Sequence, residues 1–274
     1  MGPYSILLAV WREDNPDHFR EAIESMLSQS YPAEECIIVK DGPVPASLQD
    51  VINSYQKKNV SIPIVEVVLE KHSGLATALM AGLSVAKTDL IARMDADDVS
   101  RQERCEKQVS CFESDPTLSI VGSYVSEFEE TTSKSLSIRK VPLNHEAIVN
   151  FTKRRNPFNH SSVMFRKSAV DAVGGYNPTI RYNQDWDLWL RMLHHGYRAA
   201  NIPEILLDFR FNRDTLKRRK SWTSLLQLIR LRYASYRRQE MTAWDFLSVS
   251  LLHLMMGILP LRAQSAFYKY MLRR

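Results

Sequence analysis

The feature of the sequence that most restricts its fold is a regular alternation of apolar runs with amphipathic segments. Unbroken apolar runs predict strands at residues 4–11, 35–39, 62–69 and 89–94. Between them, a helix begins at Asn15-Pro16, a second passes through residues 48–55, and a third covers residues 74–87. Strands that alternate with helices in this way predict an α/β fold with a mostly parallel sheet and helices on both faces. Ligands of such sheets bind at the carboxyl ends of the strands.

Acidic residues stand at two of these strand ends. Asp41 follows the second strand in "VKDGP", and the fourth strand ends in "LIARMDADDVSR", which places Asp95, Asp97 and Asp98 within four positions. Carboxylates that crowd together repel one another, so their presence at the mouth of a strand indicates a positive partner. A hard divalent cation, which prefers carboxylate oxygens and can bridge to a nucleotide diphosphate, is one such partner.

Two other interpretations of the acidic cluster compete with a metal site. Ser100 and Glu103 fit the capping box S-x-x-E, and acidic residues are favourable near a helix N-terminus. The pattern D-x-D-x-V also resembles the nucleophile loop of aspartyl-phosphate phosphatases, but that loop normally follows the first strand of its domain. Because the pattern here follows the fourth predicted strand, and Asp41 already forms a separate acidic turn, its position favours a metal–nucleotide site.

The remainder of the chain has a different pattern. A strand is predicted at residues 118–125, a hairpin or variable loop at 127–140, and an amphipathic helix at 185–194. Basic residues accumulate over 213–238, which indicates either a solvated face or attraction to anionic lipid. The apolar segment 246–259 is too short to span a bilayer, and it suits a helix that lies in a membrane interface or packs on a partner.

The composition indicates the charge of the partner and the cellular compartment of the protein. The net charge of +5 and the pI near 9.0 favour an anionic partner. The three cysteines show no C-x-x-C spacing, which is typical of reduced thiols in a cytosolic protein. Residues 1–10 lack a basic leader and a small-residue cleavage site, so no cleavable signal peptide is expected.

Five blocks of sequence, in order, resemble a family 2 glycosyltransferase of the GT-A fold, of the bacterial surface-polysaccharide type. They are spread over roughly the first 210 positions. They read "SILLAVWRED", "AIESMLSQSYPAEECIIVKDGP", "GLATALMAGLSVAKTDLIARMDADDVSRQER", "NPFNHSSVMFRKSAVDAVGGYNP" and "NQDWDLWLRMLHHGY". The resemblance implies a GT-A domain at 1–212, with a nucleotide-binding half at about 1–100 and an acceptor half at about 101–212. Residues 213–274 would form a basic helical region at a membrane surface.

The resemblance also implies roles for individual residues. Asp41 would contact the uracil or ribose of a UDP-sugar donor, and Asp95 would contact the ribose or metal-bound water. Asp97 would coordinate Mn²⁺ or Mg²⁺ across the two phosphates, with Asp95 as a further candidate ligand and Asp98 behind them. Asp185, in "NQDWDLW", would be the catalytic base, and helix capping is the alternative for this residue.

Five further residues are candidates, and four of them have an ordinary structural alternative. Trp11 either stacks on uracil or packs in the core, and Glu13 lies in the same loop within reach of the ribose. Arg93 either contacts the nucleotide sugar or neutralises the acidic cluster. His160 contacts the acceptor or a phosphate, or has a structural role in its turn. Trp186 forms an acceptor wall or belongs to the apolar stripe of its helix.

Two departures from the family pattern stand out. Leu79-Met80 occupies a position where many relatives carry Arg-Asn or Leu-Asn, so a polar nucleotide contact is expected to be missing. Gln184 replaces the usual glutamate before the base, which leaves the base one negative neighbour fewer and should keep its pKa lower than in the doublet. Asp187 is a rival for the base, but two residues further along a helix it should point away from Asp185.

Together these features predict an inverting, metal-dependent hexosyltransferase. Galactose is the first choice of sugar and glucose the second, with GlcNAc-diphosphate-undecaprenol as acceptor and a β-linkage formed in O-antigen assembly. The sugars follow from the resemblance alone. The enzyme is expected in the cytoplasm, peripheral at the inner-membrane surface, with no nucleic-acid partner. The alternatives are the D-x-D-x-V phosphatase and a protein that binds nucleic acid or another anionic surface through its basic tail.

Overall fold

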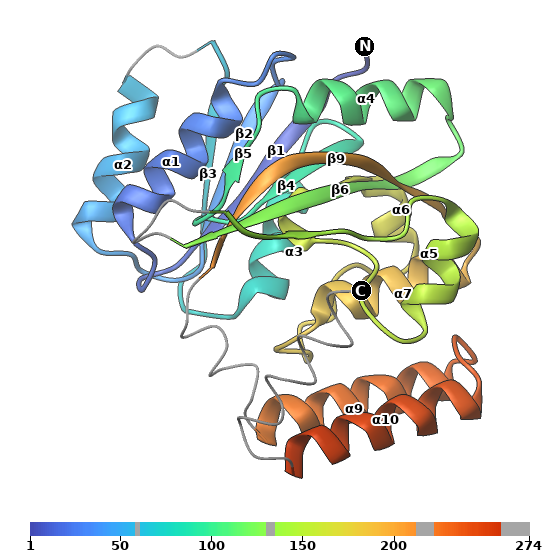
Figure 1. Cartoon of the computed structure of the whole chain (residues 1–274). Helices are drawn as coiled ribbons and strands as arrows, with labels where there is room; N and C mark the ends of the chain where they lie inside the picture. The colour runs from blue at the N-terminus through green and yellow to red at the C-terminus, as the bar shows by residue number, and fades with distance from the viewer. Residues whose placement is uncertain (58–60, 130–134, 212–221, 259–274) are drawn as a thin grey trace. The chain divides into compact units, whose positions relative to one another are not determined.

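A computed structural model describes residues 1–57, 61–129, 135–211 and 222–258 of the chain (Figure 1). The chain divides into two compact units, Met1–Asn212 and Arg213–Arg274. The first unit contains, in chain order, β1 (Tyr4–Val10), α1 (Pro16–Leu27), β2 (Glu35–Lys40), α2 (Ala46–Lys57), β3 (Ile64–Val68), α3 (Leu75–Val85), β4 (Leu90–Met94), β5 (Val99–Ser100), α4 (Arg104–Ser114), β6 (Leu118–Glu129), β7 (Ser135–Arg139), α5 (His145–Thr152), the short 3₁₀ helix η1 (His160–Ser162), β8 (Met164–Arg166), α6 (Lys167–Ala172), α7 (Gln184–His194) and β9 (Arg198–Phe211).

Within the described residues, the strands form one sheet in the order β3-β2-β1-β4-β8-β6-β9-β5, and β7 pairs with β6. Strand β1 lies between β2 and β4 and is parallel to both, and β3 is parallel to β2. The prediction of parallel pairing for the first four strands is therefore confirmed. The second half of the sheet is mixed, because β8 is antiparallel to β4 and to β6 whereas β9 runs parallel to β6.

Helices cover both faces of the sheet, as the alternation predicted (Figure 1). Side chains of successive strand residues point to opposite faces, so Ile6 and Leu8 of β1 join one apolar core and Leu7 joins the other. Helices α1, α2 and α4 contribute to the first core, and α3, α5, α6 and α7 contribute to the second. The carboxyl ends of β1, β2 and β4 consequently open between two packed helical layers.

One predicted helix start is confirmed and one is wrong. Asn15 caps α1 through its side-chain oxygen, which accepts from the backbone N–H groups of Asp17 and His18 at 2.8 and 3.2 Å. The capping box at Ser100 and Glu103 does not form, because Ser100 lies in β5 and pairs with Leu207 of β9.

The side chain that accepts a backbone N–H from the first turn of α4 belongs to a distant part of the sequence. Gln29, just beyond α1, accepts the backbone N–H of Cys105 at 2.9 Å and also donates to Ser100 Oγ. A contact between segments more than seventy residues apart therefore replaces the local motif that the sequence suggested.

The second unit, described by itself, is a helical hairpin of α9 (Trp222–Arg237) and α10 (Ala243–Ile258). The apolar segment predicted at 246–259 falls within α10 except for its last residue, which lies outside the described part. Arg213 and the basic run 217–220 also lie outside the described residues. No helix among those described is long and apolar enough to cross a bilayer.

Candidate active site

Three carboxylates gather in the loop that follows β4. Oxygen atoms of Asp95, Asp97 and Asp98 all lie within 4.8 Å of one another. Burial, and then the charges of Asp97 and Asp95, raise the pKa of Asp98 well above its ordinary value. Desolvation within the site, and then the charge of Asp95, raise the pKa of Asp97 to about 6. The loop therefore holds negative charge that the protein alone does not compensate.

Two arginines contact this loop, one from the strand that precedes it and one from far beyond it in the sequence. Arg93, the penultimate residue of β4, is 1% exposed and forms an ion pair with Asp95. Burial acts to lower the pKa of Arg93, but the charge and hydrogen bond of Asp95 outweigh it and raise this pKa. Arg210, near the end of β9, donates its backbone N–H to Asp98 at 2.9 Å and its Nε–H to the carbonyl of Asp97 at 2.8 Å. No local pattern around Arg210 predicted that it would contact this loop.

The donor set fits a hard divalent cation. The Oδ2 atom of Asp98 is buried and has no hydrogen-bond partner among the described residues, whereas Oδ1 already accepts from Arg210. A buried carboxylate oxygen without a partner is costly, and the charge of a cation held close by at Asp97 and Asp95 would offset that cost. Carboxylate oxygens are the ligands that Mg²⁺ and Mn²⁺ prefer. These residues can therefore hold such an ion.

Asp41, at the end of β2, has a different environment. Its carboxylate is 5% exposed and accepts from the backbone N–H groups of Ser73 at 2.6 Å and Gly74 at 2.9 Å. His72 Nδ1 lies 2.9 Å from Asp41 Oδ2. The carboxylate thus fixes the loop that leads into α3. Gly42 is required beside it, since its φ is +85° and a Cβ there would lie 2.6 Å from the His72 nitrogen. A nucleotide contact by Asp41 stays a prediction.

The loop after β1 places Asp14, rather than Glu13, near the acidic cluster. Glu13 has an exposed side chain that forms an ion pair with Arg12 at 4.0 Å. Asp14 is half-buried, and its Oδ2 accepts the backbone N–H of Trp11 at 2.9 Å. Burial, together with the charges of Asp97 and Asp95, raises the pKa of Asp14 to about 7. The predicted ribose contact of Glu13 therefore has no support from its position.

The different positions of Glu13 and Asp14 have a simple structural cause, and the ribose contact of Glu13 stays a prediction. The backbone N–H of Asp14 donates to the carbonyl of Trp11 at 3.0 Å, which closes a four-residue turn. Such a turn brings its last residue back beside the strand end, and Glu13 points outward. Trp11 itself is half-buried, and its ring centroid lies 5.0 Å from that of His72. Uracil stacking by Trp11 remains a prediction.

Asp185, the predicted base, lies in the first turn of α7. Asn156 donates its side-chain N–H to Asp185 Oδ2 at 2.6 Å. Burial raises the pKa of Asp185, while the backbone N–H of Trp186, the Asn156 amide and the charge of Arg93 act to lower it. The carboxylate is half-buried, so it retains some access from outside. A raised pKa with two positioned donors suits a proton acceptor.

Asp187, the rival for this role, belongs to the fold. It is fully buried and forms an ion pair with Arg191 at 2.9 Å, one turn along α7. Arg191 also donates to the carbonyls of Val173 and Gly175 at 2.6 and 2.7 Å. Asp187 therefore points away from Asp185, as its spacing predicted, and it orients the arginine that secures the loop after α6.

That loop carries Tyr176, whose hydroxyl lies 2.9 Å from Nε2 of His160. Burial lowers the pKa of His160 well below its ordinary value, and the nearby charge of Arg93 adds to this effect. His160 is thus a neutral imidazole, which does not suit it as a cationic partner for phosphate. Burial raises the pKa of Tyr176, and the charges of Asp185 and Asp95 act in the same direction while Arg93 opposes them. The candidate base, the acidic loop and Arg93 therefore lie around one hydroxyl.

Trp186 and Met80 both contribute packing. Trp186 is 4% exposed, and its indole N–H donates to the carbonyl of Thr152 at 2.9 Å. An acceptor contact by Trp186 stays a prediction. Met80 packs its sulfur 3.3 Å from the backbone nitrogen of Tyr176. Gly175 (φ +70°) is required there, since a Cβ would lie 2.5 Å from the Met80 side chain. The unusual Leu79-Met80 pair thus links α3 to the loop that carries Tyr176.

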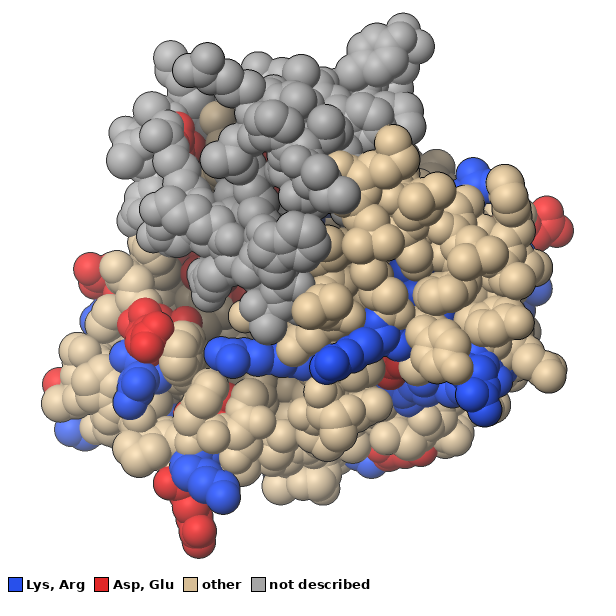
Figure 2. All heavy atoms as spheres, turned by 90° about the horizontal axis from the view of Figure 1, so that it is seen from below, with Lys and Arg blue, Asp and Glu red and all other residues tan. Residues whose placement is uncertain are grey.

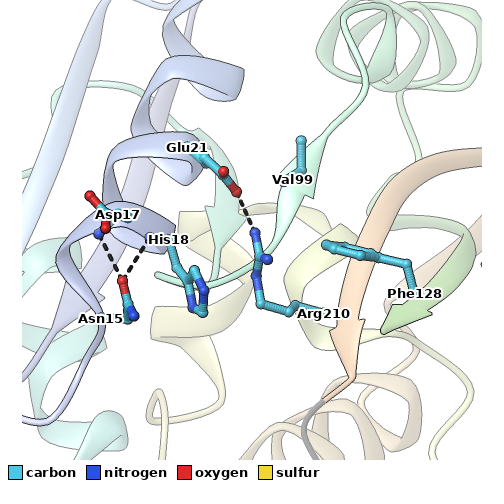
Figure 3. A pocket seen from close by; sticks show the side chains of 7 residues that line it. All are labelled: Asn15, Asp17, His18, Glu21, Val99, Phe128 and Arg210. Atoms are coloured by element: carbon cyan, nitrogen blue, oxygen red, sulfur yellow. Dashed lines mark hydrogen bonds and ion pairs between the residues drawn. The ribbon is translucent and has the colours of Figure 1, made fainter. Parts of the chain in front are cut away.

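A cavity of about 350 Å³ opens beside the acidic loop on the α1 side (Figure 3). Its lining residues come from the start of α1, from β5, from β6 and from β9, and are Asn15, Asp17, His18, Glu21, Val99, Phe128 and Arg210. Arg210 forms an ion pair with Glu21, and its guanidinium lies 4.8 Å from the centre of the Phe128 ring. The cavity therefore shares Arg210 with the acidic loop.

Comparisons with known proteins give a consistent result. The sequence matches the family model described as "Glycosyl transferase family 2" over residues 5–174. A second model, described as "Glycosyl transferase family group 2", matches residues 90–272.

Two curated relatives cover most of the chain. The amylovoran biosynthesis glycosyltransferase AmsE of Erwinia amylovora is 37% identical over 234 residues, which are 84% of this chain and 86% of that protein. An Escherichia coli enzyme named as UDP-Gal:alpha-D-GlcNAc-diphosphoundecaprenol beta-1,3-galactosyltransferase is 33% identical over 271 residues, which are 99% and 97% of the two chains. Among solved structures, TarS 1–349 of S. aureus in complex with UDP has a TM-score of 0.63 and 12% identity over 97% of this chain and 78% of that one. The likeness to TarS shows a shared fold.

Proposed function

Since the chain belongs to glycosyltransferase family 2 and has the GT-A type of fold, we propose that it transfers a hexose from a UDP-sugar to a lipid-linked GlcNAc-diphosphate acceptor. The proposed product carries a β-linkage and belongs to O-antigen or related exopolysaccharide assembly. Galactose is the first choice of sugar, because the E. coli relative that spans nearly the whole chain is named as a galactosyltransferase. Glucose is the second choice.

The observation that carries the proposal is the acidic loop. Three carboxylates lie within 4.8 Å of one another at the carboxyl end of β4, and one of their buried oxygens has no partner among the described residues. A sugar-nucleotide transferase of this family needs a group at this edge of the sheet that holds the pyrophosphate of the donor. A bound divalent ion would interact there with the carboxylates of the loop and with the phosphates of the donor. TarS, which shares the fold, has a solved complex with UDP.

We assign the cation to Asp97 and Asp95, with Asp98 behind them. When bound, Mn²⁺ or Mg²⁺ would stabilise the negative charge that develops on the leaving diphosphate. The chain's own contribution is to fix the loop: Arg210 holds the backbone of Asp97 and Oδ1 of Asp98, and Arg93 holds Asp95. Because Arg93 is buried and its pKa is raised, it gives Asp95 a fixed cationic partner within the protein.

Asp185 is the proposed base. In its ionised form it accepts the proton of an acceptor hydroxyl as that oxygen attacks the anomeric carbon. Asn156 and the first turn of α7 orient the carboxylate and stabilise its charge. One displacement with one base inverts the anomeric configuration, so an α-linked donor gives a β-linked product. A retaining route would need a second positioned carboxylate, and Asp187 is held in its ion pair with Arg191.

We place the enzyme at the cytoplasmic surface of the bacterial inner membrane. The acceptor of the E. coli relative is joined to undecaprenol, a lipid that resides in a membrane. The basic region at 213–238 and the apolar helix α10 support attraction to such a surface.

The decisive experiment measures transfer directly. Purified protein, Mn²⁺, a panel of UDP- and GDP-sugars and a GlcNAc-diphosphate-lipid analogue are incubated, and mass spectrometry and NMR identify the sugar and the anomeric configuration. We expect a β-linked hexose from a UDP-sugar, and EDTA should abolish its formation. An α-linked product, or no product from any donor in the panel, would contradict the proposal.

A paired substitution tests the base. Asp185→Asn should abolish transfer and leave the circular dichroism spectrum unchanged. Asp171→Asn removes a half-exposed aspartate whose partner is Lys167 on the same helix, and it should keep full activity. An active Asp185→Asn enzyme would remove the base assignment without affecting the family assignment.

The two alternatives predict different outcomes in the same assays. The phosphatase would release phosphate from a monoester in the absence of any sugar donor. The nucleic-acid-binding protein would be retained on DNA in a salt-dependent manner and would transfer no sugar. Family membership argues against the phosphatase, and no feature of the described residues favours either alternative.

A further inference from the structure

We propose that the exposed faces of α9 and α10 form a docking surface for an anionic phospholipid bilayer, with α10 inserted shallowly along one apolar stripe. The inference rests on the proposed function in one respect, which is that a lipid-linked acceptor brings the enzyme to a membrane. It goes further by naming the side chains that enter the bilayer and those that contact its headgroups.

The apolar stripe lies on α10. Five exposed residues recur at intervals of three and four, so they share a face about 100° wide. Their exposed fractions are Trp244 74%, Leu247 58%, Leu251 60%, Leu254 38% and Met255 56%. Apolar side chains this exposed on successive turns are unusual in a water-soluble helix, and they indicate a surface that another phase or molecule covers.

This stripe is not needed to hold the hairpin together. The opposite side of α10 packs on α9: the Phe246 ring lies 6.0 Å from that of Tyr233 and 5.9 Å from that of Tyr236. Val249 is 9% exposed, and buried Arg232 donates to the carbonyl of Asp245 at 2.6 Å. Because α10 already buries one face within the hairpin, the stripe around Leu247 and Leu251 is a second apolar face.

The exposed stripe of α9 combines arginine with aromatic and aliphatic side chains. Leu226, Arg230, Tyr233 and Arg237 follow one another at intervals of three and four, and all are exposed. Tyrosine and tryptophan are enriched where a bilayer meets water, and arginine places its charge among headgroups while its stem contacts apolar groups. The composition of this stripe therefore suits the interfacial region.

The charges of the hairpin favour an anionic surface. Among the described residues of α9, α10 and their connection, the exposed charged side chains are arginines. Glu240 is 8% exposed and bound to Arg238, and Asp245 is half-buried and accepts from Thr242 at the start of α10. For the molecule as a whole, the face drawn in Figure 2 carries both basic and acidic side chains among uncharged residues.

This charge pattern distinguishes a bilayer from a second copy of the chain. A symmetric pairing of the two hairpins would place arginines near arginines, with no exposed acid among the described hairpin residues to compensate them. The headgroups of phosphatidylglycerol supply that negative charge, and the adjacent acyl region accepts the stripe of α10.

The test is co-sedimentation of the full chain with vesicles. We expect binding to vesicles of equal parts phosphatidylcholine and phosphatidylglycerol, weaker binding to phosphatidylcholine alone, and loss of the difference at high salt. The double variant Leu247→Ser/Leu251→Ser should lower partitioning into the mixed vesicles by at least ~10-fold, since two buried leucines contribute to it. Val68→Ser, which removes a 57% exposed valine of the first unit, is the matched control and should bind as wild type.

Charge and depth are tested separately. Arg230→Gln/Arg237→Gln should weaken binding to the mixed vesicles only, and Lys87→Gln, at an exposed lysine of the first unit, should not. The emission of Trp244 should shift to the blue on binding, and Trp244→Phe should remove most of that shift. Wild-type binding by the leucine variant would overturn the proposal, as would a dimer in solution that this variant converts to monomer without a change in vesicle binding.

A water-soluble acceptor separates this proposal from the proposed function. The leucine and arginine variants should transfer sugar to a short-chain GlcNAc-diphosphate analogue at the wild-type rate, which also reports that they are folded. If neither wild type nor any variant transfers sugar to this analogue, the proposed function is contradicted. Co-sedimentation with vesicles would still show whether α9 and α10 form a docking surface.

Discussion

The strands on either side of β1 both lead into acidic residues, but their carboxylates have different partners. Asp41 follows β2 and accepts from Ser73 at one oxygen and from Gly74 at the other, so each of its oxygens has a partner, and His72 Nδ1 lies 2.9 Å from Oδ2. Asp97 and Asp98 follow β4, where desolvation and then the neighbouring carboxylates raise their pKa values, and one buried oxygen has no partner among the described residues.

This difference separates two uses of the same position in a parallel sheet. A carboxylate whose oxygens are saturated by backbone N–H groups stabilises the protein without a ligand, and its removal costs stability. A group of carboxylates that repel one another destabilises the empty protein, and its compensation must come from a cation. Four substitutions test this difference, and their expected effects decrease from Asp97 to Asp14.

Asp97→Asn should have the largest effect on activity. It removes a proposed metal ligand, and the loss of comparable electrostatic stabilisation in other enzymes lowers the rate by about 100- to 1,000-fold. Without metal, the variant should be more stable to heat than wild type, because one of three crowded charges is gone. Transfer assays with saturating Mn²⁺ and thermal unfolding in EDTA measure the two effects. A variant that is both active and destabilised would show that Asp97, like Asp41, stabilises the protein and is not a metal ligand.

Asp41→Asn should show the opposite pattern. The buried amide cannot accept from Ser73 and Gly74 as the carboxylate does, and an unsatisfied buried group costs about 1–3 kcal/mol. For a chain of this size that corresponds to a fall of roughly 2–10 °C in the unfolding midpoint. Thermal unfolding in EDTA measures it, with Asp50→Asn, on the outer side of α2, as control. An unchanged midpoint would mean that the loop before α3 holds without Asp41.

The contrast between these two sites also shows what could be predicted from the sequence. The first four strands and their helices follow local apolar patterns, and the structure confirms them. The cap at Asn15 is local as well, and it forms. Both depend on residues within one or two turns of each other, which is the range that a single sequence reports.

The features that were wrong or missed depend on distant contacts. Ser100 fits a capping box, but its pairing with Leu207 takes it into a strand. Arg210 joins the acidic loop from more than a hundred residues away. Asp14 was missed for a subtler reason, since a turn at Trp11 decides which of two adjacent acids points inward. In each case a backbone pairing, rather than the residue type, determines which side chain reaches the site.

Asp185 is intermediate between Asp41, whose oxygens both have partners, and the crowded carboxylates of the acidic loop. Its carboxylate has a donor in Asn156, yet burial still raises its pKa. Because the ionised form is the proposed base, activity should fall as the pH decreases through this raised pKa, at a higher pH than for an ordinary aspartate. Asn156→Ala removes a contact that lowers the pKa, so the acid limb of kcat/KM should move further up in pH.

The control for this prediction is Asn144→Ala, which removes the cap of α5 and contacts Ala147 rather than the base. It should cost about 1 kcal/mol of stability and leave the pH profile in place. An acid limb that does not move in Asn156→Ala would mean that Asp185 is not the titrating group in catalysis.

The smallest expected effect is that of Asp14→Asn, which tests how far the uncompensated charge extends. Asp14 is not a proposed ligand, but the charges of Asp97 and Asp95 help to raise its pKa to about 7, so it adds to the negative potential at the loop once it ionises. Asparagine keeps an oxygen that accepts from the Trp11 N–H, so the turn should be retained.

Above pH 7 the loss of one nearby charge, worth about 1 kcal/mol through a solvated site, should weaken Mn²⁺ binding by less than about tenfold. At pH 5.5 Asp14 is already protonated and the variant should bind as wild type does. Calorimetric titration of Mn²⁺ at the two pH values measures this, and a pH-independent difference would show that Asp14 acts through the turn and not through its charge.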